Sequence, residues 1–278
     1  MHPLSRRRTL QLAAFGTAAG LVRPAGAGSC LVLPQSIEGP FYFDPHLVRT
    51  DITEGRRGVP LGLELTVVGA DCHPLADARV DLWHADAQGV YSGYDRQGDG
   101  RELSTGGKTF LRGTQFSDAR GMARFSTIFP GWYQGRTTHL HFKVFLGQRG
   151  VLTAQIYFPD ALNEFIYENV AAYRRPQPRD TLNRTDFIAR AAGNGAFAGI
   201  REESGRYLAA LVVGVDPAAT AASGDRPPLG GPAGPPPGPP GESAGRPPGG
   251  PPPGGPPGPG GASLTGEPRL RALIPGAD

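Results

Sequence analysis

The sequence predicts an all-β fold, an antiparallel β-sandwich with one short helix. The first indication is a series of short segments in which apolar and polar residues alternate, which places successive side chains on opposite faces of a strand. The second is the regular separation of these segments by clusters rich in Gly, Asp and Pro, which favour turns. The third is length, because residues 30–216, about 187 positions, suit one domain of ordinary size.

Several segments carry the strand pattern at regular spacing, which is typical of an antiparallel sandwich. The predicted strands are 63–68, 78–83, 109–116, 122–128, 139–146, 151–158 and 207–213. A helix is predicted near 161–172, because Asp160 follows Pro159 and can serve as its N-cap.

Residues 1–29 are predicted to be a signal peptide of the twin-arginine type. Ser5-Arg-Arg-Arg-Thr-Leu10 carries the arginines, an apolar stretch runs to Val22, and Ala25-Gly-Ala27 offers a small-residue cleavage site. The apolar stretch is too short and too rich in Ala and Gly for a transmembrane helix, so no membrane span is expected. The protein is therefore expected to be exported, to the periplasm or the extracellular space. A retained Arg-rich tail is the alternative.

Residues 217–278 are predicted to be a disordered tail. The chain has 42 Gly and 30 Pro, and much of both falls after Asp216, without the strict period of collagen and with few apolar residues to bury. The sequence names no partner for this tail. The net charge is only +3 and the positive residues are scattered, so nucleic acid is not an expected partner.

His139-Leu-His141 lies in a predicted strand and suggests a metal site. Residues 140, 142, 144 and 146 are all apolar, so the two histidines share the opposite face and can bind one ion. Two strand histidines without a metal explain the pattern equally well, and zinc, copper and ferrous sites use it too.

Two tyrosines favour a harder ion. Tyr91 lies upstream of the histidine pair, and Tyr133 follows Gly131-Trp132. A trivalent cation stabilises a phenolate directly, and anionic oxygen donors select hard ions, so ferric iron, Fe(III), is the best candidate. For either tyrosine alone, a buried ring with a hydrogen-bonded hydroxyl is the ordinary alternative.

The ordered combination of motifs over about residues 30–175 resembles the intradiol ring-cleavage dioxygenases, such as protocatechuate 3,4-dioxygenase and catechol 1,2-dioxygenase. The similarity is closest to small, secreted proteins of this kind. The matching segments are Glu38-Gly-Pro-Phe-Tyr42, Asp51-Ile-Thr-Glu-Gly55, 81–91, Phe129-Pro-Gly-Trp-Tyr133, Arg136-Thr-Thr-His-Leu-His141 and Thr153-Ala-Gln-Ile-Tyr-Phe158.

The resemblance implies that Tyr91, Tyr133, His139 and His141 are ligands of Fe(III). It implies a reaction in which O2 cleaves a catechol between its two hydroxyl-bearing carbons and gives a muconate-type dicarboxylate. The partners it implies are therefore a small catechol substrate and O2.

The resemblance also implies catalytic roles for Tyr133, Arg136 and Gln155. Tyr133 would accept a substrate proton, and the guanidinium of Arg136 would stabilise negative charge on the substrate. Gln155 would lie beside the substrate and oxygen pocket, and Trp83 would orient a ligand. Packing in the core is the alternative for Trp83, and a strand-surface amide is the alternative for Gln155. The neighbouring His84 is expected to be structural.

One departure from the family pattern concerns the connection between Tyr133 and Arg136. Only Gln134 and Gly135 separate them, whereas relatives have a longer connection, so a more open site is expected. The pocket wall is expected to include some of Pro40, Phe41 and Tyr42. A homo-oligomer is compatible with the sequence.

Two other function classes remain open at this level. One is a secreted, non-catalytic sandwich that binds an aromatic compound or a carbohydrate. The other is a zinc or copper metalloprotein in which the tyrosines are structural.

The cysteines are Cys30 and Cys72. In an oxidising compartment they are expected to form a disulfide that joins the mature N-terminus to the turn over 70–74. Lipidation of Cys30 is the alternative.

Overall fold

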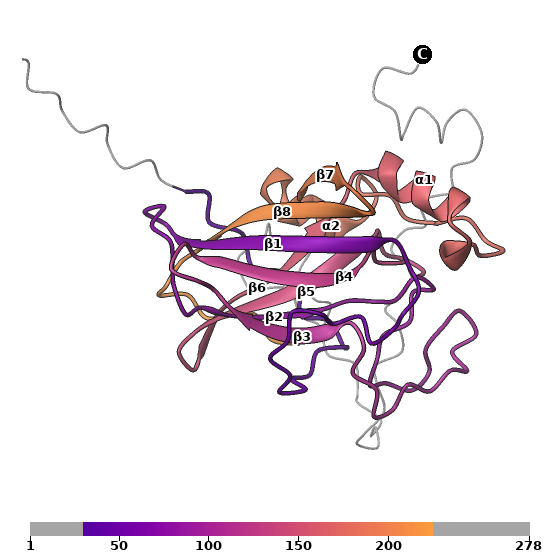
Figure 1. The fold of residues 1–278 in the computed structure, drawn as a ribbon, viewed down its shortest axis with the longest axis horizontal. Helices are drawn as coiled ribbons and strands as arrows, with labels where there is room; N and C mark the ends of the chain where they lie inside the picture. The colour runs from indigo at the N-terminus through magenta and orange to yellow at the C-terminus, as the bar shows by residue number, and fades with distance from the viewer. Residues whose placement is uncertain (1–29, 225–278) are drawn as a thin grey trace, which may run out of the picture.

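The computed structural model describes residues 30–224. The predicted signal peptide, and the predicted tail from residue 225 onward, lie outside the described residues. Within this part of the chain, eight strands form two four-stranded sheets, which lie one over the other in Figure 1. Over the same residues, no helix is both long enough and apolar enough to cross a membrane.

The first sheet has the strand order β4-β1-β8-β7. Its strands are β4 (Met122–Ile128), β1 (Pro60–Gly69), β8 (Arg206–Val215) and β7 (Gly199–Glu203). β1 pairs antiparallel with β4 but parallel with β8, so the prediction of a purely antiparallel sandwich is wrong for this sheet. A parallel pair needs a long connection, and here most of the domain lies between the two strands.

The second sheet is antiparallel throughout and has the order β3-β2-β5-β6. Its strands are β3 (Arg112–Phe116), β2 (Arg79–Trp83), β5 (His139–Leu146) and β6 (Arg149–Tyr157). The register pairs Trp83 with His141 across β2 and β5, and His141 with Gln155 across β5 and β6. Paired residues point to the same face of a sheet, so these three side chains form one row.

The alternation of apolar and polar residues along β5 places its apolar side chains on one face, as predicted. Leu140, Phe142 and Val144 are fully buried in the core between the sheets. Burial of each such side chain contributes about 1.5–3 kcal/mol, which fixes the register of the strand. His139, His141 and Lys143 consequently lie on the other face.

That other face is covered by residues 35–44, which we call the covering segment. The hydroxyl of Tyr42 donates a hydrogen bond to a carboxylate oxygen of Asp81 on β2, 2.8 Å away. Glu38 forms an ion pair with the buried Lys143 of β5. These contacts hold the covering segment over this face of β5.

The predicted helix is α1 (Asp160–Asn169), which is followed by a 3₁₀ turn, η1 (Ala171–Tyr173). Pro159, not Asp160, occupies its N-cap, and no side chain caps it. The carboxylate of Asp160 is instead engaged by Arg179 and by the backbone N–H of Asn183. Figure 1 shows α1 at one end of the sandwich.

One helix and one strand were not predicted from the sequence. α2 (Phe187–Ala192) is followed by a second 3₁₀ turn, η2 (Asn194–Ala196), which leads towards β7. Both α2 and β7 are short, and β7 is largely exposed at the edge of its sheet.

Residues 217–224, which we call the C-terminal strap, lie against the domain, so the predicted boundary at residue 216 is wrong. The backbone N–H of Ala221 donates to the carbonyl of Gly150 at 2.9 Å. The hydroxyl of Thr153 donates to the carbonyl of Ala222 at 2.7 Å. β6 is an edge strand with free backbone groups, and the strap satisfies some of them.

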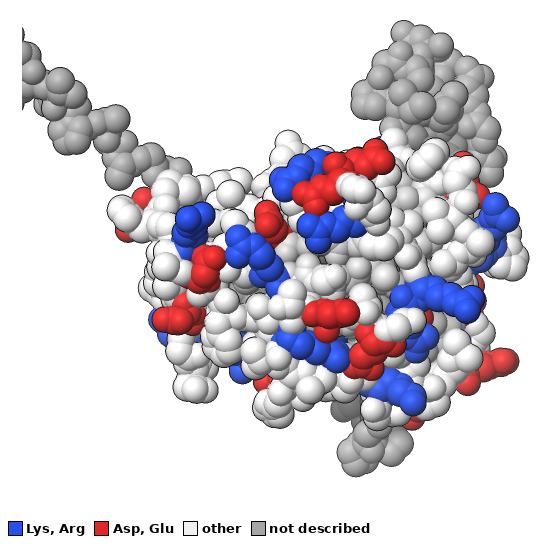
Figure 2. Space-filling model, viewed as in Figure 1, with Lys and Arg blue, Asp and Glu red and all other residues white. Residues whose placement is uncertain are grey.

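The N-terminus of the described chain is fixed by the predicted disulfide between Cys30 and Cys72. The backbone N–H of Cys30 also donates to the carbonyl of Ala70 at 3.1 Å. A sulfur in a disulfide cannot carry a thioether lipid, so the structure favours the disulfide over lipidation. On the face shown in Figure 2, positive and negative side chains are interspersed.

Candidate metal centre

β5 brings the two predicted histidines together. The Nε2 atoms of His139 and His141 lie 3.0 Å apart, and both side chains are buried. The Nδ1 atom of His139 lies 2.6 Å from the carbonyl oxygen of Thr137. A carbonyl oxygen can only accept a hydrogen bond, so Nδ1 of His139 carries the proton. Its Nε2 atom is therefore unprotonated, and the lone pair faces Tyr133 and His141, the other candidate metal ligands.

The ring of His141 stacks on Trp83, and Gly39 leaves little room for a side chain beside it. The indole of Trp83 stacks on it, with ring centroids 5.0 Å apart. On another side, a Cβ atom placed at Gly39 would lie 3.4 Å from its Cε1 atom, and Gly39 has φ +76°. A side chain at Gly39 would be strained by the backbone and would press on the imidazole. Trp83 thus packs against the ring of His141, which is where an orienting group would lie.

The two predicted tyrosines join the same cluster from separate loops. The hydroxyl of Tyr133 lies 3.2 Å from Nε2 of His139. The ring of Tyr91 lies 5.7 Å from that of Tyr133 and 6.2 Å from that of His141, measured between centroids. Tyr91 is 1% exposed, and its buried hydroxyl, which lies beside that of Tyr133, makes no hydrogen bond of good geometry.

These residues fit a metal ion. Adjacent donors that bind one ion at about 2.1 Å and at roughly right angles lie about 3 Å from each other, which is the spacing observed among Tyr133, His139 and His141. A buried hydroxyl without a hydrogen bond of good geometry is costly, and a cation beside Tyr91 would remove that cost. In residues 30–224 no group of three His, Cys, Asp or Glu side chains could hold a metal, and the polar side chain within hydrogen-bonding distance of His139 besides His141 is the phenol of Tyr133.

Burial determines the charge state of the four donors. It holds the pKa of both His139 and His141 well below the usual histidine value, and the guanidinium of Arg136 lowers both further. The imidazoles are therefore neutral and able to bind a metal. Burial also raises the pKa of Tyr91 and of Tyr133, while Arg136 opposes the rise at both. Binding of a cation would thus displace the phenol protons.

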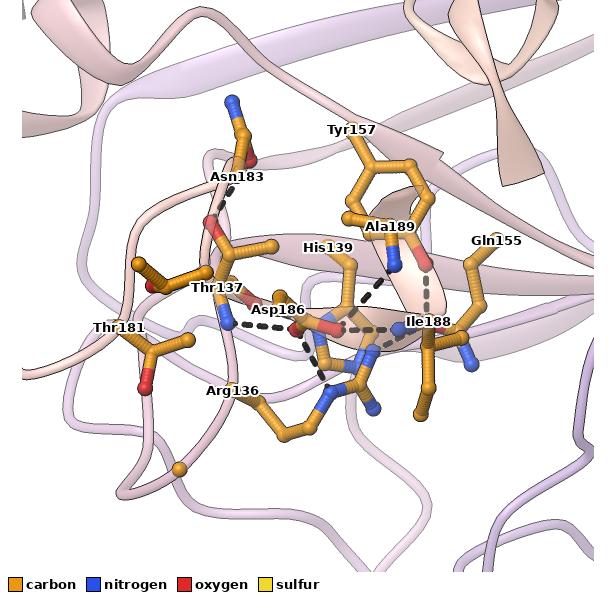
Figure 3. Close-up of polar contacts among 12 residues, drawn as sticks. Arg136, Thr137, His139, Gln155, Tyr157, Thr181, Asn183, Asp186, Ile188 and Ala189 are labelled. Carbon is orange, nitrogen blue, oxygen red and sulfur yellow. Dashed lines mark hydrogen bonds and ion pairs between the residues drawn. The ribbon is translucent and has the colours of Figure 1, made fainter. Parts of the chain in front are cut away.

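The two remaining predicted residues, Arg136 and Gln155, contact each other beside the donors. Nη2 of Arg136 donates to Oε1 of Gln155 at 2.6 Å, and the hydroxyl of Tyr157 donates to the same oxygen at 2.9 Å. Nε of Arg136 donates to a carboxylate oxygen of Asp186 at 2.8 Å (Figure 3). Gln155 is therefore a buried amide within the cluster, not a strand-surface group.

His84 takes no part in the cluster. Its Nδ1 lies 2.8 Å from the carbonyl of Ala85, and its Nε2 lies 2.7 Å from the hydroxyl of Thr127. Both ring nitrogens are thus used, which agrees with the expected structural role.

The short connection between Tyr133 and Arg136 forms a tight turn. The backbone N–H of Gly135 donates to the carboxylate of Asp180 at 3.1 Å. Tyr133 is half-buried and Gln134 is exposed, whereas Tyr91 and the two histidines are buried. Tyr133 is therefore the one residue of the four candidate donors that is partly exposed.

The structure brings all six predicted side chains into one cluster: Tyr91, Tyr133, Arg136, His139, His141 and Gln155. The sequence analysis missed Asp186, which binds Arg136 from a distant part of the chain. Its position before the apolar start of α2 is an N-cap signal that could have drawn attention to it.

The geometry defines a β-sandwich protein with a cluster of Tyr and His side chains at one sheet face, and comparisons with known proteins show its family. The family model described as Dioxygenase matches residues 37–182. A catechol 1,2-dioxygenase from Acinetobacter baylyi is 30% identical over 209 residues, which cover 66% of this chain and 64% of that protein. Catechol 1,2-dioxygenase 1 from Acinetobacter lwoffii is 34% identical over 134 residues, which cover 45% of this chain and 40% of that protein.

Among solved structures, the intradiol ring-cleavage dioxygenase from Tetranychus urticae aligns with a TM-score of 0.62 and 27% identity. The alignment covers 69% of this chain and 98% of that one. This chain spans less than two thirds of the length of either catechol dioxygenase. The family match covers more than half of the chain, which therefore belongs to the intradiol ring-cleavage dioxygenase family.

Proposed function

We propose that this protein is a non-haem Fe(III) dioxygenase that cleaves a catechol between its two hydroxyl-bearing carbons with O2. The product is a muconate-type dicarboxylate. The observation that carries the proposal is the convergence of the Tyr133 hydroxyl and the two histidine Nε2 atoms, 3.0–3.2 Å apart, beside the buried hydroxyl of Tyr91.

Tyr91, Tyr133, His139 and His141 would hold the iron. Two phenolates supply anionic oxygen donors to a hard trivalent ion, and two neutral imidazoles complete the set. When bound, Fe(III) would supply the Lewis acid that activates a catechol for reaction with O2.

Tyr133 is the residue best placed to handle a substrate proton. Its residue is partly exposed, whereas Tyr91 and both histidines are buried, and we assign its Oη atom as the proton acceptor. A proton from one substrate hydroxyl passes to that oxygen, and the tight turn through Gly135 leaves the side chain at the edge of the cluster.

Arg136 stabilises the negative charge that the deprotonated substrate carries. Its guanidinium remains charged beside the cluster, because its carboxylate partner Asp186 is buried with it. Such a fixed charge in a site with little water acts strongly on a developing anion. Gln155 holds the guanidinium from the opposite element, β6.

The covering segment forms part of the substrate wall. The ring of Phe41 stacks on that of Tyr91, with centroids 4.5 Å apart and an interplanar angle of 23°. Tyr42 packs on Trp83 and directs its hydroxyl to Asp81. Phe41 is therefore the residue of this segment that we assign to the wall beside a flat aromatic substrate.

The test is oxygen uptake by the purified, iron-loaded protein with catechol, hydroxyquinol, protocatechuate and chlorinated catechols, with product absorbance recorded. We expect a red-brown protein, from phenolate-to-Fe(III) charge transfer, that consumes oxygen with at least one of these compounds. A coloured protein without oxygen uptake would indicate a binding protein instead. A colourless protein that retains zinc or copper would contradict the iron assignment.

Loss of one imidazole gives a direct test of the ligand set. We expect His141→Ala to weaken iron binding by at least roughly 100-fold, since removal of groups that only orient ligands already costs 10- to 100-fold. The exposed His73 is the matched control, and His73→Ala should keep its iron and its colour.

We also propose that the protein is exported and works in an oxidising compartment. The disulfide between Cys30 and Cys72 supports this location, because such bonds persist outside the reducing cytosol. Fractionation of cells that express the full chain, with the disulfide assayed by thiol labelling, tests the proposal.

A further inference from the structure

Arg136 is held by a residue outside the stretch that matches the family model. The family match ends at residue 182, and the ion pair is made by Asp186, which is 3% exposed. The contact runs through Nε, the side of the guanidinium nearest to its own chain, at 2.8 Å. Gln155 takes the neighbouring Nη2 atom. Two contacts along one edge fix the plane of the guanidinium.

Both oxygens of Asp186 are fully used. Oδ2 accepts from Nε of Arg136 and, at 2.9 Å, from the backbone N–H of Thr137. Oδ1 accepts from the backbone N–H groups of Ile188 and Ala189, at 2.8 and 3.1 Å, and so caps α2. Figure 3 shows the carboxylate between the turn that carries Arg136 and the start of α2.

The contact with Thr137 extends this arrangement to a metal-binding side chain. The N–H of Thr137 is held by Asp186, and the carbonyl of the same residue accepts the hydrogen bond from Nδ1 of His139 at 2.6 Å. The position of that carbonyl sets the ring orientation of His139. The carboxylate of Asp186 thus contacts the guanidinium of Arg136 directly and the imidazole of His139 through the peptide of Thr137.

We propose that Asp186 is a positioning residue for this centre, which orients Arg136 directly and His139 through the peptide of Thr137. This inference rests on the proposed function for its catalytic consequence. Four N–H donors converge on the side chain, so both acceptor oxygens are required. Asparagine has one oxygen and would direct its amide N–H2 at two of the four donors.

The competing explanation is that Asp186 only caps α2. Asp186→Ser separates the two roles, because serine is a good N-cap but is too short to reach Arg136. The matched control is Ala191→Gly, which weakens α2 at an exposed position and leaves the carboxylate in place.

The first measurement uses the metal-free protein and does not depend on activity. NMR hydrogen exchange reports on the Nε–H of Arg136 and the backbone N–H of Thr137. In Asp186→Ser we expect both to exchange at least roughly 10-fold faster than in the wild type, because the acceptor that protects them is gone. In Ala191→Gly both should keep the wild-type rate.

The second measurement uses the iron-loaded protein. For Asp186→Ser we expect kcat to fall on the order of 10- to 100-fold, with a smaller change in KM, because a displaced charge affects the transition state more than substrate binding. The phenolate-to-Fe(III) absorption band should also shift, which loss of a helix cap would not cause. Ala191→Gly should retain the wild-type kcat and band.

Two results would overturn the inference. One is an Asp186→Ser protein with wild-type exchange at both N–H groups and wild-type kcat. The other is equal loss in Asp186→Ser and Ala191→Gly, which would assign the effect to α2. If the wild type cleaves no catechol, the proposed function fails, and the exchange rates in metal-free protein still decide the positioning role.

Discussion

At the scale of single residues, the four candidate donors differ in their access to solvent. Tyr91 and both histidines are almost fully buried, while Tyr133 is half-buried at the end of a tight turn. This difference in exposure favours different roles for Tyr133 and for the three buried side chains. The proposed function accordingly assigns only metal binding to the buried donors and adds proton transfer at Tyr133.

Tyr133→Phe tests this division. We expect the variant to retain iron through the other three donors and to lose turnover by on the order of 100-fold or more, since the proton acceptor is missing. Iron content and oxygen uptake measure the two effects separately. Tyr207→Phe on β8, in the other sheet, is the control and should have normal kcat. A Tyr133→Phe protein with full activity would refute the proton-acceptor role.

His84 makes a contribution to the free energy of unfolding that depends on pH. Burial lowers the pKa of His84 to about 4, from about 6.5 in an unfolded chain. The unfolded state therefore binds the proton first, and stability is lost as pH falls from about 6.5 towards 4. The contribution of this group reaches about 3 kcal/mol, at roughly 1.4 kcal/mol per pH unit.

We expect His84→Gln to remove this contribution, because glutamine keeps a donor and an acceptor but does not titrate. Urea unfolding at several pH values between 7 and 4 gives the slope for each protein. The wild type should lose more free energy of unfolding over this range than the variant. Parallel slopes would mean that His84 does not titrate on unfolding.

At the scale of elements, strands with a buried face could be predicted and those without one could not. β4 and β5 have the predicted bounds, because one face of each packs in the core and enforces alternation. β7 contains Arg201, Glu202 and Glu203 and lies exposed at an edge, so no apolar pattern marks it. α2 has only six residues and shows no helical period. Its start is fixed by Asp186, whose second partner, Arg136, is distant in the sequence.

The C-terminal strap is a further segment whose contacts could not be predicted from amino-acid composition. Its residues, half of them Ala, show neither a strand nor a helix pattern, but they bond to β6 and to the covering segment. The backbone N–H of Gly224 donates to the carboxylate of Glu38 at 3.1 Å. The side chain of Gln35 accepts from Ala222 at 3.1 Å.

We expect a chain that ends at residue 224 to be as stable as the full mature chain. A chain that ends at residue 216 should lose about 1–3 kcal/mol, since a few hydrogen bonds, each worth about 1 kcal/mol net, disappear with the strap. Urea unfolding of the two truncated proteins measures the difference. Equal stability of both would show that the strap contributes nothing to the fold.

At the scale of the whole molecule, the class of fold followed from local pattern but the pairing of distant strands did not. The parallel contact between β1 and β8 joins segments near the two ends of the domain, and alternation within each strand carries no information about its neighbour's direction. The candidate donors were identified by their motifs, whereas the approach of Asp186 depends on the completed fold.

The disulfide acts at this scale because it closes a loop with a sequence separation of 42 residues. We expect the double variant Cys30→Ser, Cys72→Ser to lose about 3–4 kcal/mol of unfolding free energy, mainly because the unfolded chain gains freedom. Urea unfolding under oxidising conditions measures the loss. A difference below about 0.5 kcal/mol would show that the bond adds little to the surrounding contacts.

The covering segment begins at residue 35, five residues after Cys30. The disulfide therefore anchors the stretch that leads to the cover of the candidate iron site, and a reductant can break this bond. Leu33 holds the intervening stretch to β8 by one backbone bond of 2.9 Å to Gly214. Reduction would therefore loosen residues 30–34, whereas the covering segment would stay held by the ion pair of Glu38 with Lys143 and the hydrogen bond of Tyr42 to Asp81. The disulfide thus secures the start of the described chain, and the arrangement of the candidate donors does not depend on it.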